Sequence, residues 1–170
     1  FAVVVLAKPN HHGMNNELYN VLLHLHSVGR WIVLVLLLIA IFNSAVAGNR
    51  PFIKSDNRTG LLLTIFADLM LLIGIALWFM SPRWGYTTIQ ARGMADVMGD
   101  ATARFYVIEH LTGMLIAIIL LHIGKAQARK PIGDRAKHRR TLIYYTIALL
   151  LILLSIPWPF RSIAAGSGWY

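Results

Sequence analysis

The chain contains no cysteine among its 170 residues. A chain without cysteine cannot form a disulfide, an iron–sulfur cluster, a thiolate metal site or a covalently attached c-type haem. Charged residues are also scarce, at 14% of the sequence, whereas ordinary soluble domains contain about 25%. Hydrophobic residues make up 57% of the chain. This composition predicts an integral membrane protein embedded in a lipid bilayer.

Acidic residues are the scarcest charged class. Seven Asp and Glu stand against 16 Lys and Arg, which gives a net charge of +9. Nucleic-acid binding by a basic protein normally requires a soluble basic domain, and the sequence has no polar stretch long enough to form one. We therefore expect no nucleic-acid partner and assign the positive charge to loops that face anionic lipid.

Four segments are long and apolar enough to cross a bilayer, which takes about 20 residues in a helix. The sequence predicts an all-α integral membrane protein, a four-helix up-and-down bundle over residues 18–163. Because Met14 is the first methionine, residues 1–17 are interpreted as an exported or partly artefactual N-terminal arm. The expected spans are about 18–47, 59–80, 105–124 and 141–158, followed by a C-terminal tail at 164–170.

Loop charges predict the orientation of this bundle. The loop after the first span carries three basic residues and the 125–140 loop carries seven, ten in all, against five on the other side. Because positive loops normally stay in the cytoplasm, the 125–140 loop is expected there and both termini are expected outside.

Ionisable side chains also occur within the apolar spans, where such groups are rare and usually pair in the bundle interior. Arg30, Asp68 and Glu109 are predicted to form a buried polar network, with Arg30–Asp68 as the first pairing and Glu109 as the competing partner. His122 has no obvious partner near the end of the third span. His138, in the basic sequence RAKHRR, is interpreted as a solvated loop residue.

Histidines of the first and third spans fall at similar depth. His24 and His26 are about 200° apart on a helix, so they cannot face the same point, whereas His26 shares a face with Arg30. Two histidines on different helices at one depth are the minimum for bis-imidazole ligation of haem b. We predict that His26 and His110 ligate the haem iron, with His24 as the alternative to His26.

Other interpretations of these residues stay open at the level of sequence. The polar groups can form a hydrogen-bonded network that fixes helix register without a cofactor. A metal ion, a pigment or a quinone are further candidates, with the metal ion held by His24, His26, Glu109 and His110. No constellation typical of a hydrolase or transferase occurs, so we expect no independent catalytic activity.

Four stretches, LLHLHSVGRW, FADLMLLIGIALWF, EHLTGMLIAIILLHIGKA and SIPWPF, resemble a family of small four-helix bacterial membrane proteins commonly labelled "cytochrome b". The similarity runs from about Leu18 to Arg161, and H-x-H-S-x-x-R-W and I-P-W-P-F are its most specific elements. The resemblance implies the four-helix architecture and adds support for a haem b. Together with the loop charges and the histidines, it leads us to expect an electron-transfer-type subunit of the bacterial inner membrane, with periplasmic termini, at most one haem b and other membrane subunits as partners. A cofactor-free accessory subunit is the alternative. Members of this family often carry histidine where this chain has Asp68, so that position cannot supply a ligand here.

Overall fold

The computed structural model describes the backbone of residues 11–164 and the side chains of residues 16–164. All regular structure in this part of the chain is helical, with no strand, which confirms the predicted all-α class. The long helices are α1 (His11–Ala45), α2 (Lys54–Met80), α5 (His110–Ala126) and α6 (Asp134–Ser155). The short elements are α3 (Tyr86–Gly99), α4 (Ala101–Arg104), the π-helix η1 (Phe105–Glu109) and the 3-10 helices η2 (Gln127–Arg129) and η3 (Ser162–Ala164).

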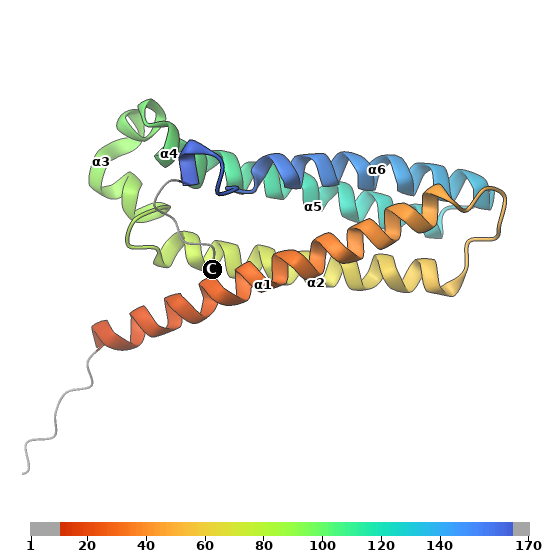
Figure 1. Cartoon of the computed structure of the whole chain (residues 1–170), viewed down its shortest axis with the longest axis horizontal. Helices are drawn as coiled ribbons and strands as arrows, with labels where there is room; N and C mark the ends of the chain where they lie inside the picture. The colour runs from red at the N-terminus through yellow and green to blue at the C-terminus, as the bar shows by residue number, and fades with distance from the viewer. Residues whose placement is uncertain (1–10, 165–170) are drawn as a thin grey trace, which may run out of the picture.

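The four long helices lie side by side, and each packs against two of the others (Figure 1). α1 contacts α2 and α6, and α5 contacts the same two helices, so α1 and α5 face each other diagonally. We call the end of the assembly at which α3 and α4 lie the α3 end, and the opposite end the η2 end. The shared core is built mainly from aliphatic side chains, and Leu37, Leu63, Leu121 and Tyr145 are among its largest fully buried side chains.

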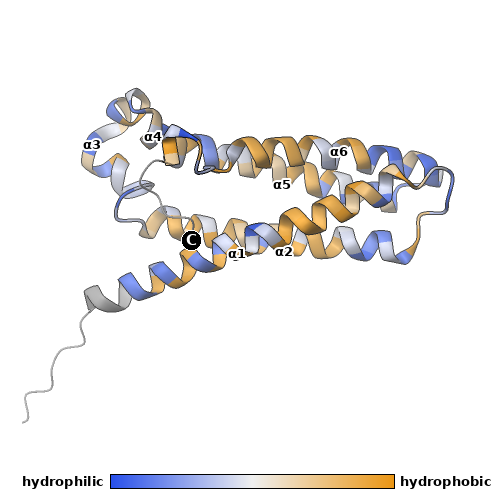
Figure 2. Cartoon of the chain, viewed as in Figure 1, coloured by the Kyte–Doolittle hydropathy of each residue, from blue (hydrophilic) through white to orange (hydrophobic). Residues whose placement is uncertain are grey.

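Three segments are long and apolar enough to span a membrane: Asn16–Ala45, Lys54–Met80 and Ala101–Arg129. The sequence predicted four such spans. The fourth expected span lies in α6, which is not among these three segments. This helix begins with the charged run DRAKHRR and becomes apolar only after Thr141. Figure 2 shows this gradient as a polar stretch of α6 at the η2 end and apolar residues along the rest of the helix.

The boundaries of the predicted segments shift in the structure. α1 begins at His11, within the segment 1–17 predicted as an arm, and residues 1–10 and 165–170 of the predicted arm and tail lie outside the described residues. The third apolar segment begins at Ala101 rather than near Phe105, because α4, η1 and α5 follow one another without an intervening loop.

The first half of α1 diverges from the other helices toward the α3 end (Figure 1). From residue 16 onward, Gly29 is the first buried residue of this helix. Four apolar residues before it, Leu18, Val21, Leu25 and Val28, are at least half exposed, and Leu22 and Leu23 are partly exposed. Since close side-chain packing holds helices together in lipid as well as in water, this half of α1 is weakly held.

Close packing at the η2 end depends on two glycines. A Cβ atom on Gly124 would lie 2.5 Å from Cε1 of Tyr145, and one on Gly60 would lie 2.9 Å from the hydroxyl oxygen of the same residue. Tyr145 is only 2% exposed. The absence of side chains at both glycines therefore lets α2 and α5 close on the tyrosine ring of α6.

Candidate functional site

The structure brings together the two histidines that the sequence favoured as a ligand pair. The rings of His26 on α1 and His110 on α5 have centroids 6.3 Å apart and planes inclined by 70°. A metal held between two imidazoles by bonds of about 2 Å, with about 1.1 Å from each nitrogen to its ring centre, would place the centroids about 6 Å apart. The observed spacing is therefore suited to two ligands of one iron atom.

A hydrogen bond fixes the orientation of the His110 ring. Its Nδ1 lies 2.7 Å from the carbonyl oxygen of Ser155 on α6. Because a carbonyl oxygen only accepts, Nδ1 carries the proton and Nε2 of the neutral ring carries the lone pair. Hydrogen bonds of this kind commonly orient histidines that ligate metals. Nε2 of His110 is thus able to act as a ligand. The hydrogen bond from Nδ1 to Ser155 also connects α5 with α6, with or without a ligand.

The backbone before His110 is a π-helix rather than an α-helix. The N–H group of His110 donates to the carbonyl oxygen of Phe105, five residues earlier. Within this turn, the indole Nε1 of Trp78 donates to the carbonyl oxygen of Val107 at 3.0 Å. Such π-turns insert one residue into a helix and occur frequently at functional sites. Nothing in the sequence indicated this turn, which sets the direction in which His110 points.

His26 lies between α2 and His110. A Cβ atom on Gly74 would approach its Cε1 to 3.2 Å, so this glycine provides the space for the imidazole ring. Nδ1 of His26 is buried and makes no hydrogen bond to any described part of the chain. Arg30, one helical turn away, interacts electrostatically with both histidines. His24 is exposed, on a different face of α1 from His26.

The two carboxylates of the predicted polar network are paired away from Arg30. Asp68 contacts Nε2 of His122 at 2.8 Å, and Glu109 contacts Nε of Arg104 at 2.7 Å. Asp68 directly follows the buried Ala67, and one residue turns a helix by about 100°, so its side chain points out of the core. The expected pairings of Arg30 with these carboxylates are thus corrected, and His122 has a partner that the sequence did not reveal.

The described side chains contain no cluster of three or more His, Asp or Glu able to hold a metal ion. The four-residue metal site considered from sequence is therefore not assembled, because His24 is exposed and Glu109 is paired with Arg104.

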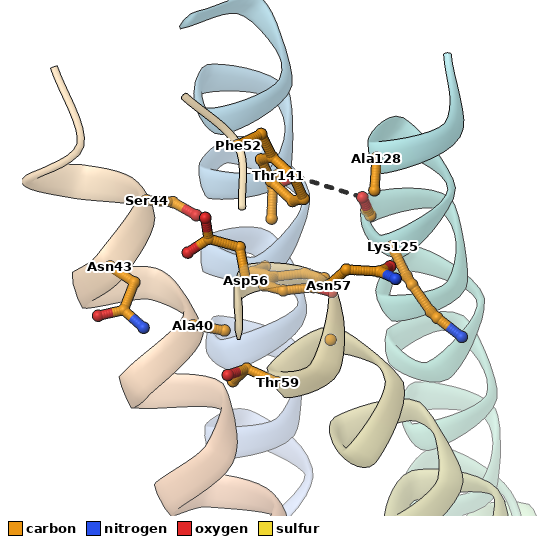
Figure 3. Close-up of a pocket in the computed structure, with 13 residues that line it drawn as sticks. Ala40, Asn43, Ser44, Phe52, Asp56, Asn57, Thr59, Lys125, Ala128 and Thr141 are labelled. Atoms are coloured by element: carbon orange, nitrogen blue, oxygen red, sulfur yellow. Dashed lines mark hydrogen bonds between the residues drawn. The ribbon is translucent and has the colours of Figure 1, made fainter. Parts of the chain in front are cut away.

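A small cavity lies at the η2 end (Figure 3). Its volume is about 10 Å³, which suffices for about one water molecule. Beside it, both carboxylate oxygens of Asp56 bind the guanidinium of Arg50, at 2.7 and 2.8 Å. This hydrogen-bonded pairing raises the pKa of Arg50. Thr141 donates to the carbonyl oxygen of Gly124 at 3.3 Å across the same cavity. The cavity is too small for an organic cofactor.

His138 is buried rather than solvated. It is 2% exposed, and its ring centroid lies 4.9 Å from that of Phe52. Neither ring nitrogen makes a hydrogen bond within residues 16–164. The missed signal is its position on the buried stripe of α6, which continues at Thr141, Tyr145, Ala148 and Ile152. The adjacent arginines suggested a solvated loop, whereas the helical spacing places His138 in the core.

Comparisons of this chain with protein-family models, with curated proteins and with solved structures found no match.

Proposed function

We propose that the chain is a membrane-embedded electron-transfer subunit, and that it binds one b-type haem between α1 and α5 of a four-helix bundle. The supporting observation is the 6.3 Å separation of the His26 and His110 ring centroids, from two diagonal helices. His26 and His110 would hold the iron, and the haem would supply a one-electron carrier. Arg30 would offset the negative charge of a haem propionate.

The donor set fits this group. Neutral imidazole is a good ligand for haem iron, and His110 is oriented through its opposite ring nitrogen. Nδ1 of His26 is buried and makes no hydrogen bond to the described chain, while the same ring also forms a hydrogen bond with the backbone of Met70. The first half of α1 has no buried residue between 16 and 28. This part of α1 can therefore be displaced from α5 to admit a flat ring at little cost in packing.

The proposed location is the bacterial inner membrane, with α1, α2, α5 and α6 as spans. The apolar segments supply the hydrophobic length. Basic residues gather at the η2 end in residues 125–140, which comprise the end of α5, η2, the connection to α6 and the start of α6. The positive-inside rule assigns this end to the cytoplasm. The termini would then be periplasmic.

The test is a dithionite-reduced minus oxidised spectrum of the purified protein, produced in cells supplied with a haem precursor. We expect an α-band near about 560 nm, typical of b-type haem. His26→Ala and His110→Ala should each remove most of the band. His24→Ala is the matched control, because it deletes the same side chain two residues away on the exposed face. Absence of the band in the unaltered protein, or its survival in His110→Ala, contradicts the proposal.

A cofactor-free accessory subunit of a larger membrane complex is the second candidate. It is favoured by the direct edge-to-face approach of the two histidine rings and by the bond from His110 to Ser155, which join helices without any cofactor. In this case His26→Ala and His110→Ala lower the stability of the protein, and the unaltered protein has no haem band.

A further inference from the structure

Three exposed arginines lie in the first two turns of α6, at the η2 end. Arg135, Arg139 and Arg140 form no ion pair with an acidic side chain of residues 16–164. An arginine keeps its positive charge at any physiological pH. This face of α6 therefore carries positive charge that the described part of the chain does not balance.

The acidic side chains of the η2 end are bonded to other cations. Asp134 contacts Nζ of Lys137 at 3.4 Å, and Asp56 contacts Arg50 at 2.7 Å. After Asp134 the sequence contains no acidic residue. A counter-charge for the three arginines therefore has to come from outside the described chain.

The exposed face of α6 turns apolar directly after the arginines, a change that Figure 2 shows along the helix. Its exposed positions after Arg140 are four aliphatic residues and one uncharged polar residue: Ile143, Ile147, Leu150, Leu154 and Thr146. From Ile143 to Leu154 this stripe is about 16 Å long, at about 1.5 Å per residue. The hydrocarbon layer of one bilayer leaflet is about 15 Å thick, half of about 30 Å. The arginines are thus followed by an apolar stripe as deep as one leaflet.

Helical geometry aligns the charged part of this face with the apolar part. Ile143 lies about 40° from Arg139 and about 60° from Arg140, on opposite sides, because each residue turns the helix by about 100°. The two arginines therefore flank the start of the apolar stripe. A guanidinium group binds a phosphate group through two parallel hydrogen bonds. A molecule with a phosphate group above a hydrocarbon chain matches both parts of the face.

We infer that the outer face of α6 binds an anionic phospholipid, with its phosphate group at Arg139 and Arg140 and one acyl chain along the stripe that begins at Ile143. The inference rests on the membrane location proposed above, which places the η2 end at the cytoplasmic leaflet. Anionic lipids give that leaflet a negative surface potential, which attracts basic segments beside a membrane span. An acidic soluble protein or a nucleic acid would match the arginines but leave the aliphatic stripe uncovered.

Native mass spectrometry of the delipidated full chain in detergent tests this inference. The protein is titrated with dioleoyl phosphatidylglycerol, which is anionic, or with dioleoyl phosphatidylcholine, which has the same acyl chains and no net charge. We expect phosphatidylglycerol to bind at least about tenfold more tightly, since each basic residue near a membrane surface contributes about fivefold to the binding of anionic lipid. An equal concentration of inorganic phosphate should not displace it, because free phosphate makes no contact with the aliphatic stripe.

Arg139→Gln and Arg140→Gln should each weaken the binding of phosphatidylglycerol about fivefold and leave that of phosphatidylcholine unchanged. Arg83→Gln is the matched control, because Arg83 is also exposed and has no ion pair within residues 16–164, but lies at the α3 end. Far-UV circular dichroism checks that the helices of each variant are intact. The inference is overturned by equal affinity for both lipids, by displacement with inorganic phosphate, by an equal loss in Arg83→Gln, or by unchanged affinity in a folded Arg139→Gln/Arg140→Gln double variant.

Alkaline carbonate extraction of isolated membranes separates this inference from the membrane location. A chain that carbonate removes from the membranes contradicts both. A chain that stays in the membranes but binds the two lipids equally contradicts the phospholipid site alone. Neither result depends on whether haem is bound.

Discussion

At the η2 end of the helix assembly the ring of Tyr145 packs against two glycines, whereas nearer the α3 end two histidine rings from α1 and α5 contact each other. The first arrangement joins α2, α5 and α6 with no room for a side chain at Gly124. In the second, α1 is weakly packed, because it has no buried residue between 16 and 28 and its first half diverges from the other helices (Figure 1). The difference separates a closely packed part of the molecule from a part in which one helix has few buried residues.

Both regions bury histidine, but in different surroundings. His110 is oriented by the Ser155 carbonyl and faces a second imidazole. His138 lies against Phe52 and has no other histidine ring beside it among the described contacts. An orienting hydrogen bond and a second imidazole thus distinguish the His26–His110 pair, which we propose as the haem site, from His138.

The largest expected effect concerns the closely packed region. Gly124→Ala places a methyl group 2.5 Å from the Tyr145 ring and 3.2 Å from Cβ of Tyr144. Overpacking of this kind should lower the free energy of unfolding by about 1–3 kcal/mol. Thermal or denaturant unfolding in detergent, followed by circular dichroism, measures it.

Gly99→Ala is the control for this substitution, because no atom lies within 4 Å of the added methyl group. Its stability should be equal to or slightly above that of the unaltered protein, since alanine favours helix. If the two alanine variants unfold alike, the η2 end is not the rigid part of the assembly.

A smaller effect is expected at the π-turn before His110. Trp78→Phe keeps an aromatic ring but removes the donor to the Val107 carbonyl, bonded at 3.0 Å. The loss of this hydrogen bond should cost about 1 kcal/mol. It should also weaken haem retention, because the turn sets the direction of His110. Unfolding and the α-band amplitude are measured on the same sample.

Trp84→Phe is the matched control for Trp78→Phe. The Trp84 ring stacks on Tyr106 with centroids 5.2 Å apart, and phenylalanine retains such stacking. An equal loss of haem from both variants would show that the π-turn has no specific role in placing His110.

The smallest effect concerns the start of α4. Asp100 accepts the N–H groups of Ala103 and Thr102 and binds Arg92, and these interactions lower its pKa. A lowered pKa means that the carboxylate stabilises the fold above the pKa of the unfolded chain, about 3.9. This stabilisation is lost as the pH falls through the lower pKa of the folded state.

Asp100→Ala should therefore lower the melting temperature slightly at pH 6, and its difference from the unaltered protein should narrow below about pH 4. Asp100→Asn is the control, because asparagine also caps helices but does not titrate there. A difference that stays constant down to pH 2 would rule out the carboxylate as the cause.

Much of the helical layout follows from the sequence, since apolar runs of about 20 residues and their breakers mark helices directly. His24 and His26 lie on different faces of α1, as their helical spacing predicts, because helix geometry is local. Pairings between helices were less predictable: Asp68 was expected beside Arg30 and lies beside His122. Each residue of an α-helix is rotated by about 100° from the one before it, so neighbouring residues point in different directions. The sequence of a single helix does not show which of its faces a neighbouring helix covers.

The sequence by itself determined the helical class, the apolar segments, the scarcity of charge and the exclusion of all cysteine chemistry, because each follows from composition and local periodicity. Only the tertiary structure decided that His26 meets His110, that Ser155 orients His110, that a π-turn precedes it and that His138 is buried. These features depend on how helices distant in sequence pack together, and close packing decides such contacts at the scale of single atoms.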